Sequence, residues 1–325
     1  MKLPRRNFLH LAAGAVALPA ISRIAWAETY PTRAVRWING TAAGSAPDIV
    51  ARIIGQWLSD RLGQPFVIEN RPGAGTNIGT EAVARALPDG YSLLLVTQSN
   101  AINATLYEHL NFNFIHDIVP VASISRGSLV MELNPSVPVK TVPEFIDYAK
   151  ANPGKLNMAS AGKGTPQHVA GELFKMMAGV NMLHVPYRGS PFALTALIAG
   201  EVQVMFDTMP ASIEHIKAGQ IRPLAVTTTS RSELLPDLPT VGDFVPGYEA
   251  SSWYGAGAPK NTPVEIINKL NKEINAGLDD PKMKARLADL GVAVIQTSPA
   301  GFGKFIVDET EKWGKVVQAA NIKPD

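Results

Sequence analysis

The chain has 325 residues, no cysteine, and 30 basic against 28 acidic side chains, a formal net charge of +2. The absence of cysteine excludes a disulfide-based fold. Four basic residues (Lys2, Arg5, Arg6 and Arg23) and no acid lie in the first 27 residues, so the remainder has 26 basic against 28 acidic residues, a charge of −2. No basic cluster remains, and we therefore expect no nucleic-acid partner.

The first 27 residues have the three parts of a secretory signal peptide. The basic start is followed by an apolar run over residues 8–21 and by Ala25-Trp26-Ala27, an A-x-A cleavage pattern. The apolar run is too short to span a bilayer. Arg5-Arg6 fits a twin-arginine signal, which Arg23 favours and Pro4 opposes, and an ordinary Sec signal is the alternative. With no lipid-attachment cysteine, the mature chain is predicted to lie in the periplasm without a membrane anchor.

Beyond the signal, short β-rich runs alternate with helical patterns, which is typical of α/β proteins with largely parallel sheets. The predicted strands are 35–39, 66–69, 92–96, 129–133, 156–159, 182–185, 203–206 and 221–226. Apolar residues at helical spacing predict helices over 48–62, from about 165 to 178, and over the C-terminal segment around 302–317. Two possible capping boxes, Thr141 to Glu144 and Thr262 to Glu265, predict further helix starts.

Four strand-to-helix loops end in proline at the expected first helical position: 44–47, 162–166, 188–191 and 207–210. Proline suits that position because it lacks the N–H that would otherwise be unpaired. The start of a helix carries partial positive charge and free N–H groups, and such loops gather at the carboxyl edge of a parallel sheet. For any single loop, simple helix stabilisation is the better interpretation. The four together favour a shared anion-binding cleft.

Motifs for catalysis, cofactors and metals are weak. The glycines at 73, 75 and 79 follow a strand, but their spacing is G-x-G-x-x-x-G and no ribose-binding acid follows the strand 92–96, so a structural turn is favoured. No G-x-S-x-G elbow occurs. The mature chain's histidines show no metal-ligand spacing, although His168 is set apart by its place in the first turn of a helix at the expected cleft. We predict no catalytic residue, no cofactor and no metal, and therefore not an enzyme.

Seven sequence blocks carry a family resemblance: LGQPFVIENRPGAG at 62–75, PDGY at 88–91, PGKLN at 153–157, HVPYRG at 184–189, VQVMFD at 202–207, LPDLPTV at 235–241 and KWGKVV at 312–317. In this order they resemble the periplasmic solute-binding proteins of tripartite tricarboxylate transporters, the Bug receptors. The resemblance implies a two-lobed Venus-flytrap α/β fold with the ligand cleft between the lobes. Lobe 1 would comprise 28–126 and 255–325, and lobe 2 would comprise 127–254.

The same resemblance implies a receptor that delivers a small organic carboxylate to the membrane components of a transporter. The ligand would be a di- or tricarboxylate, an acidic amino acid or an aromatic acid, and the receptor is expected to be a monomer. Two alternatives stay open. One is a ligand-sensing subunit for a two-component system, and the other is an exported α/β enzyme, for which no nucleophile–base pair is found.

Carried over by position, the resemblance implies a site on the strand-to-helix loops of both lobes. Here Ser45 and Pro47 stand where glycine and threonine are common in the family, and Pro166 where serine is frequent. Backbone N–H groups of Gly44 and Ser45 are expected to hold a carboxylate, with Lys163 or Arg188 as the nearest cation. Trp37 is expected in either the cleft or the core. The predicted ligand-binding residues are Thr41, Ala43, Gly44, Ser45, Asp48, Thr97, Ser99, Asn100, Ser160, Gly164, Thr165, His168, Arg188, Gly189 and Asp207, of which the two aspartates would brace loops.

Overall fold

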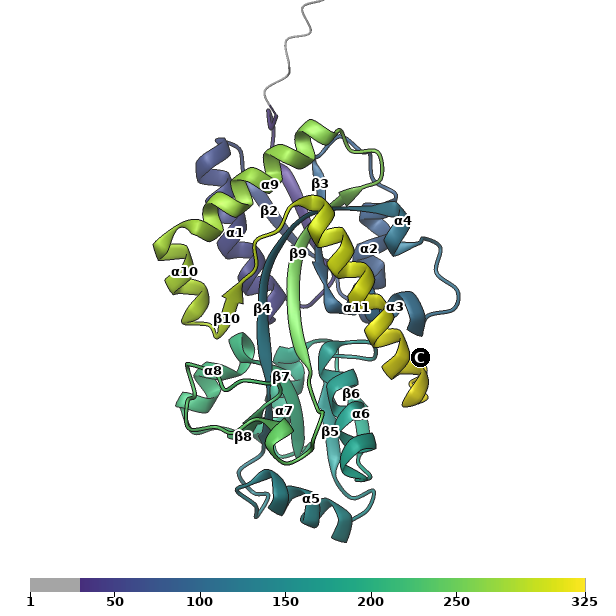
Figure 1. Cartoon of the computed structure of the whole chain (residues 1–325), viewed down its shortest axis with the longest axis vertical. Coiled ribbons are helices and arrows are strands. Elements are labelled where there is room, and N and C mark those ends of the chain that lie inside the picture. Colours follow the sequence, from purple (N-terminus) through teal and green to yellow (C-terminus); the bar gives the residue numbers. More distant parts are fainter. Residues whose placement is uncertain (1–29, 325) are drawn as a thin grey trace, which may run out of the picture.

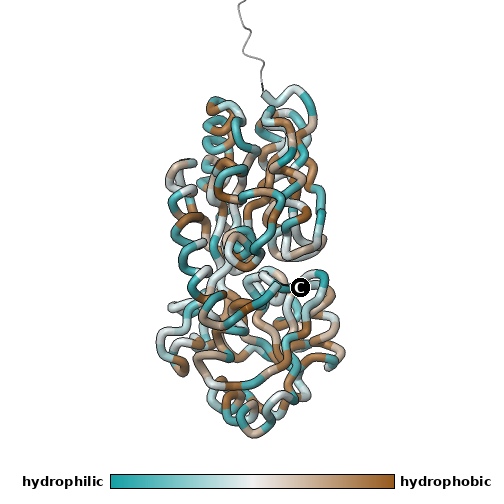
Figure 2. Tube along the Cα trace, turned by 90° about the vertical axis from the view of Figure 1, so that its right-hand side faces the viewer, coloured by the Kyte–Doolittle hydropathy of each residue, from teal (hydrophilic) through white to brown (hydrophobic). Residues whose placement is uncertain are grey.

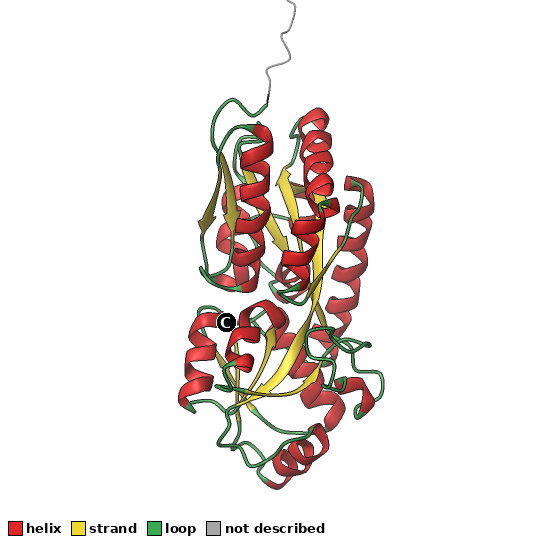
Figure 3. Cartoon of the chain, turned by 90° about the vertical axis from the view of Figure 1, so that its left-hand side faces the viewer, coloured by secondary structure: helices red, strands yellow, loops and turns green. Residues whose placement is uncertain are grey.

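The computed structural model describes residues 30–324, so the predicted signal peptide lies outside the described residues. The described chain forms two α/β lobes stacked along the longest axis (Figure 1). This confirms the predicted fold class. Seen from the side, long strands and one long helix run from one lobe into the other (Figure 3). A search of the described helices for a span apolar and long enough to cross a membrane finds none.

The first lobe is built on a sheet in the strand order β2-β1-β3-β9-β4. Its parallel strands are β1 (Val35–Asn39), β2 (Phe66–Asn70) and β3 (Ser92–Thr97). The helices that follow them are α1 (Ala46–Leu62), α2 (Asn77–Ala84), which the short η2 (Ala74–Thr76) precedes, and α3 (Gln98–Leu106). Because these strands are parallel, the helices all begin at one edge of the sheet. That edge faces the second lobe (Figure 1).

The second lobe repeats this plan on strands in the order β4-β7-β5-β6, with β8 paired to β4. Its strands are β5 (Asn157–Ser160), β6 (Leu183–Pro186), β7 (Val204–Thr208) and β8 (Arg222–Val226). Its helices are α5 (Val142–Ala151), α6 (Pro166–Ala178), α7 (Ser190–Ala199) and α8 (Met209–Lys217), and η3 (Val241–Asp243) lies after β8. One large apolar cluster fills the first lobe, and the other fills the second lobe and also takes in Ile102 and Leu106 of α3. Hydrophobic segments accordingly recur along both lobes (Figure 2).

Two long antiparallel strands connect the lobes: β4 (Ile118–Leu133), after the one-turn α4 (Phe114–Asp117), and β9 (Ser251–Pro259). β4 pairs with β9 as far as Ser128 and with β7 from Leu129 onward. Only the last part of β4, at 129–133, was predicted, because the rest of the pair is rich in serine, glycine, alanine and proline. Those small residues are required by packing, since a methyl group at Gly255 would lie 2.2 Å from the ring of Phe302.

The C-terminal segment comprises α9 (Val264–Asp279), α10 (Pro281–Ala288), β10 (Val292–Val294) and α11 (Pro299–Ala319). Phe302 at the start of α11 belongs to a core cluster of the first lobe, whereas Trp313 near its end belongs to the large cluster of the second lobe. Between them, Glu309 accepts hydrogen bonds from the indole N–H groups of Trp253 (2.8 Å) and Trp313 (3.0 Å). α11 therefore packs against both lobes and is hydrogen-bonded to the crossing strand β9.

The predicted helix starts have mixed outcomes. Proline stands in the first turn of α1, α6, α7 and α8, as predicted. Thr141 caps α5 by accepting from the N–H of Glu144, which confirms that cap. The box at Thr262 is wrong: α9 begins after Pro263 with no side-chain cap, and the Thr262 hydroxyl instead donates to the Pro259 carbonyl at 2.7 Å. The proline fixes the entry into α9 without that cap.

Candidate ligand-binding site

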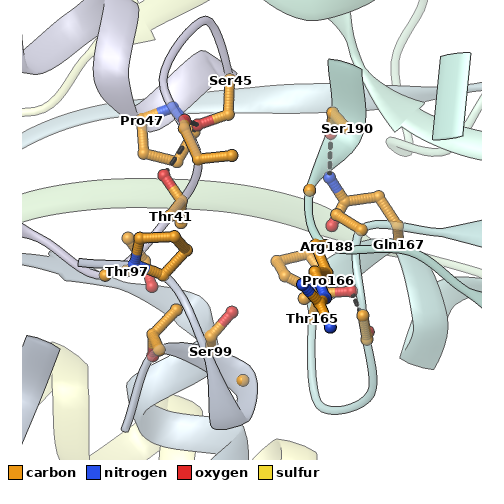
Figure 4. Close-up of a pocket in the computed structure, with 18 of the residues that line it drawn as sticks. Thr41, Ser45, Pro47, Thr97, Ser99, Thr165, Pro166, Gln167, Arg188 and Ser190 are labelled. Atoms are coloured by element: carbon orange, nitrogen blue, oxygen red, sulfur yellow. Dashed lines mark hydrogen bonds between the residues drawn. The ribbon is translucent and has the colours of Figure 1, made fainter. Parts of the chain in front are cut away.

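A cavity of about 540 Å³ lies between the lobes and is lined by residues of both. The first lobe contributes the loops that follow β1, β2 and β3, at 40–47, 72–76 and 97–99, and the second lobe contributes those after β5 and β6, at 161–167 and 186–190. Thr208 and Tyr254 complete the lining. In the close-up, Thr41, Ser45 and Ser99 face Thr165, Gln167 and Ser190 across the cavity (Figure 4). The carboxyl edges of the two parallel sheets therefore meet at one site.

The charge on the cavity wall is positive. In the described part of the chain, the lining residues include Lys163 and Arg188 but no aspartate or glutamate. Helices α1, α3, α6 and α7 begin in the lining loops, and each helix start carries roughly half a positive charge. The wall thus suits an anion.

The loop after β1 uses its polar groups internally. The hydroxyl groups of Thr41 and Ser45 are 2.7 Å apart and have Asn39 Oδ1 and the Ala42 carbonyl as further acceptors. Both hydroxyl protons are therefore engaged by protein acceptors. The N–H of Ser45 also bonds to the Ala42 carbonyl at 3.3 Å. The polar groups of this loop are thus paired with one another and with Asn39.

Asp48 braces this loop from behind. It accepts from the N–H of Gly44 at 2.9 Å, from Asn70 Nδ2 at 2.9 Å and from Arg52. Burial alone would raise the pKa of Asp48, but the hydrogen bonds from Arg52, Gly44 and Asn70 hold that pKa below its usual value. The N–H groups of Gly44 and Ser45, which we expected to hold a carboxylate, are both already paired within the protein.

The loop after β5 is likewise closed on itself. Ser160 Oγ lies 2.6 Å from His184 Nε2 and accepts from the N–H of Gly162. The N–H of Gly164 donates to His168 Nδ1 at 3.3 Å. Thr165 caps α6 by accepting from the N–H of His168, while its own hydroxyl donates to the Gly162 carbonyl at 2.6 Å. Of these residues, Gly162 and Thr165 line the cavity.

His168 and His184, apart in the sequence, stack with ring centroids 3.9 Å apart and planes 14° from parallel. Glu172 lies close enough for a three-residue ligand set, but parallel rings cannot point two nitrogen lone pairs at one ion. His168 Nδ1 is occupied by Gly164, and Glu172 pairs with Lys175 at 2.9 Å. Burial, with the nearby His184, lowers the pKa of His168 to about 3. His168 is therefore neutral, and the stacked pair fits a support for the loop better than a metal centre.

Asp207 organises the wall of the second lobe from a fully buried position. Its Oδ1 accepts from Gln167 Nε2 (3.0 Å), Ser190 Oγ (2.8 Å) and the N–H of Thr208 (2.7 Å), all residues that line the cavity. Burial raises the pKa of Asp207 despite these bonds. Burial, with the neighbouring Asp207, raises the pKa of Glu132 on β4 well above its usual value. Two buried carboxyl groups thus lie behind the wall.

The structure brings about half of the predicted site residues to the cavity. Those that line it are Thr41, Ser45, Thr97, Ser99, Thr165, Arg188 and Gly189. Ala43 and Gly44 are exposed outside the lining, and Asn100 is buried behind it, accepting from the N–H of Thr97 at 2.7 Å. The others behind the lining are the supporting residues described above, Asp48, Ser160, Gly164, His168 and Asp207. Direct contact of any of these residues with a ligand stays a prediction.

Sequence reasoning missed part of the lining. The glycine-rich turn at 73–75, predicted as structural, lines the cavity, and its backbone has positive φ at Ala74 and Thr76. Its place after a parallel strand was the available signal, but it lacks the proline that identified the other loops. Gln167 and Ser190, at the starts of α6 and α7, were also missed. Trp37, for which the sequence allowed either the cleft or the core, is fully buried in the core.

The lobes touch each other on both sides of the cavity, at two glycines. A methyl group on Gly189 would lie 2.6 Å from Ala42 Cβ, and one on Gly164 would lie 2.3 Å from Asn103 Oδ1. Real Cβ contacts are longer than 3.0 Å, so a larger residue at either glycine would require the contacted side chain or the lobes themselves to move. The structure therefore has the closed arrangement of the two lobes.

Comparison with known proteins gives matches along nearly the whole chain. Residues 50–322 match the model of the tripartite tricarboxylate transporter family receptor. Protein BugT of Bordetella pertussis is 34% identical over 311 residues, which cover 95% of each chain. The solved structure of Rhodopseudomonas palustris Rpa4515 with adipate is 37% identical with a TM-score of 0.89, covering 91% of this chain and 100% of that one. That of MatC from Rhodopseudomonas palustris with bound malate is 30% identical with a TM-score of 0.85, covering 89% and 100%.

Proposed function

The chain belongs to the tripartite tricarboxylate transporter receptor family, and we propose that it binds a small organic carboxylate in the periplasm and delivers it to the membrane components of such a transporter. Membership confirms the resemblance seen in the sequence. Because this family and its solved members are solute-binding receptors, it also confirms that the chain is not an enzyme. The observation that carries the proposal is the wall between the lobes, whose lining, in the part of the chain that the structure describes, has two cations, several helix starts and no acid.

The ligand carboxylate is held by the donors that the protein leaves unused. Among the described residues, no acceptor is paired with the hydroxyl of Ser99, which lies at the start of α3, and Arg188 is exposed at the wall. A helix start contributes about 0.3–1 kcal/mol, or up to ~2 when partly buried. Micromolar binding needs about −8 kcal/mol. Charge-assisted hydrogen bonds and closure of the lobes therefore supply the greater share.

Closure is a movement of lobe 1 (28–126 and 255–325) against lobe 2 (127–254). The change of partner in β4 between Ser128 and Leu129 supports this division. Rigid lobes joined by crossing strands are suited to hinge motion around a bound ligand. The mature receptor works as a monomer after removal of residues 1–27.

A thermal-shift panel on the mature chain, residues 28–325, tests the proposal. The panel holds di- and tricarboxylates, acidic amino acids and aromatic acids, with sugars and neutral amino acids as controls. A ligand that binds only the folded state raises the melting temperature, by about 2.7 kcal/mol of added stability at one hundred times Kd. We expect a rise with one class of acids. A rise with a control ligand and with no acid would overturn the proposal.

A further inference from the structure

The turn at residues 73–76, which lines the cavity, has a positive φ at every residue. The angles are +133° at Gly73, +46° at Ala74, +61° at Gly75 and +88° at Thr76. Glycine adopts such angles freely, but alanine and threonine adopt them at a cost. A backbone of this kind persists only where its surroundings hold it in place. The groups that hold this left-handed turn therefore decide its shape.

Two asparagines of α3 hold the left-handed turn from within the first lobe. Asn103 Nδ2 donates to the Gly75 carbonyl at 2.5 Å. Because a carbonyl can only accept, this contact fixes the orientation of the Asn103 amide. Asn100 lies one turn earlier and donates to Thr80 Oγ1 at 2.7 Å, and the Thr80 hydroxyl donates to the Thr76 carbonyl at 3.1 Å. Both asparagines are buried behind the cavity lining.

Asn103 differs from Asn100 because the other end of its amide faces the second lobe. A methyl group on Gly164 would lie 2.3 Å from Asn103 Oδ1. A methyl group on Gly75 would lie 2.8 Å from the Lys163 carbonyl and 3.0 Å from Asn103 Nδ2. The backbone of the second lobe at 163–164 thus lies against the left-handed turn and also against the side chain that holds it.

The first lobe leaves the left-handed turn little room to retreat. On the side away from the second lobe, a methyl group on Gly40 would lie 2.7 Å from Thr76 Cβ. We therefore expect a turn that loses its hold to move toward the cavity or toward the second lobe. Either movement would disturb the surface against which the second lobe closes.

We propose that Asn103 is a positioning residue for closure, which holds the left-handed turn in the shape against which the 163–164 backbone closes. The inference rests on the proposed function and adds to it a residue that couples the cavity wall of the first lobe to the movement of the lobes. Without the amide of Asn103, the closed state loses its contacts at Gly75 and Gly164. Because a ligand enters before the lobes close, its release becomes faster while its association rate stays the same.

Asn103→Ala removes the hold on the turn and tests the inference by ligand kinetics. The matched control is Asn134→Ala, a buried asparagine of the second lobe whose Nδ2 likewise donates to backbone carbonyls, those of Leu197 (2.7 Å) and Ile198 (3.1 Å). Both variants should lose unfolding free energy in urea titrations. In stopped-flow measurements with the acid that the thermal-shift panel identifies, we expect release about tenfold faster for Asn103→Ala alone. A folded Asn103→Ala variant that releases the acid at the wild-type rate overturns the inference.

A double variant separates the proposed role from a structural role within the first lobe. The methyl group of Gly164→Ala meets Asn103 Oδ1, which Asn103→Ala removes, whereas the contact with Leu106 Cδ2 at 2.9 Å remains. The two substituted residues belong to different lobes and meet when the lobes close. We expect the release rate of the double variant to fall short of the product of the two single effects by at least about threefold. Independent effects would confine Asn103 to the first lobe and contradict the coupling.

Amide hydrogen exchange distinguishes failure of this inference from failure of the proposed function. In the ligand-free protein, Asn103→Ala should speed exchange at residues 73–77, and Asn134→Ala should not. Unchanged exchange there would show that Asn103 does not hold the turn. In the wild type, the acid should slow exchange at 73–77, and the absence of such slowing on binding overturns the inference even if no Asn103 variant folds. A wild-type chain that binds no acid overturns the proposed function instead.

Discussion

Replacing Gly164 with alanine should block closure of the two lobes while leaving each lobe folded. Gly164 lies before α6 with φ +73°, and a methyl group there would be 2.3 Å from Asn103 Oδ1 and 2.9 Å from Leu106 Cδ2. Both neighbours belong to α3 in the first lobe. Asn103 is 1% exposed and its Nδ2 bonds to the Gly75 carbonyl and to Asn77 Oδ1, so its side chain is held in place. Because ordinary contact begins near 3.4 Å, we expect the lobes to part by roughly 1 Å, enough to lose a quarter to a half of the attraction between facing atoms.

The helix that follows Gly164 provides a matched control. Gly179 ends α6 with φ +64°, and a methyl group there meets nothing within 4 Å. Alanine in a left-handed conformation costs about 1–2 kcal/mol, and both variants should lose this much stability. Gly164→Ala alone adds the clash in the closed state. Overpacking costs about 1–3 kcal/mol, so the Kd for the ligand should rise by about 5- to 150-fold.

The assay is calorimetric titration of both variants with the acid that the thermal-shift panel identifies, together with urea unfolding of the free proteins. We expect similar unfolding free energies for the two variants but weaker binding for Gly164→Ala alone. If both variants bind within twofold of each other, the contact between Gly164 and Asn103 does not limit closure, and the reasoning is refuted.

Substitutions at three further positions probe the support behind the cavity. Asp207→Ala removes the acceptor shared by Gln167, Ser190 and Thr208 and should lower the unfolding free energy by about 3–5 kcal/mol in urea titrations. Asp207→Asn keeps an acceptor and should lose less, and equal losses would contradict this. Burial and the neighbouring Asp207 raise the pKa of Glu132 in the folded protein. Above about pH 4.5 the carboxyl group therefore ionises in the unfolded chain but stays neutral in the folded one, and stability falls as pH rises. Glu132→Gln should therefore match wild type in melting temperature near pH 4 and gain progressively at higher pH, and a constant offset would refute the assignment. Thr165→Ala removes the cap of α6 and should cost about 1 kcal/mol in thermal unfolding, while an unchanged melting temperature would show that the cap is not needed.

The sequence predicts most of the sheet and the place of the site, because these depend on local patterns. Proline at the first turn of α1, α6, α7 and α8 marked four loops, and the structure places residues of all four at the cavity wall. The strand β1 has the predicted bounds. The crossing strand β9 was not predicted, because it contains Gly255 and Gly257, which disfavour a strand by local propensity. These glycines are needed because α11 and β4 pack closely against the strand, a tertiary contact that the local sequence does not indicate.

The use of individual donors could not be predicted, because it depends on side chains that come from distant segments. From the sequence, the backbone N–H groups of Gly44 and Gly164 were expected to be free, because both residues lie in glycine-containing loops. In the structure they donate to the side chains of Asp48 and His168. The acceptors lie four residues further along, in the first turn of the following helix. In each lobe, the first turn of a helix whose start favours an anion also carries a side chain, Asp48 or His168, that accepts the backbone N–H of the preceding loop.

The two buried carboxyl groups explain how an anion site can tolerate acids behind its wall. Ionised Asp207 and Glu132 would repel a carboxylate ligand through the low-dielectric wall. Burial raises the pKa of both groups, which favours their neutral forms. The accepting oxygen of Asp207 also takes protons from Gln167 and Ser190, so these two side chains use donors within the wall. For the carboxylate ligand proposed above, the favourable charge at the wall is that of the helix starts and of Arg188, which the second lobe supplies.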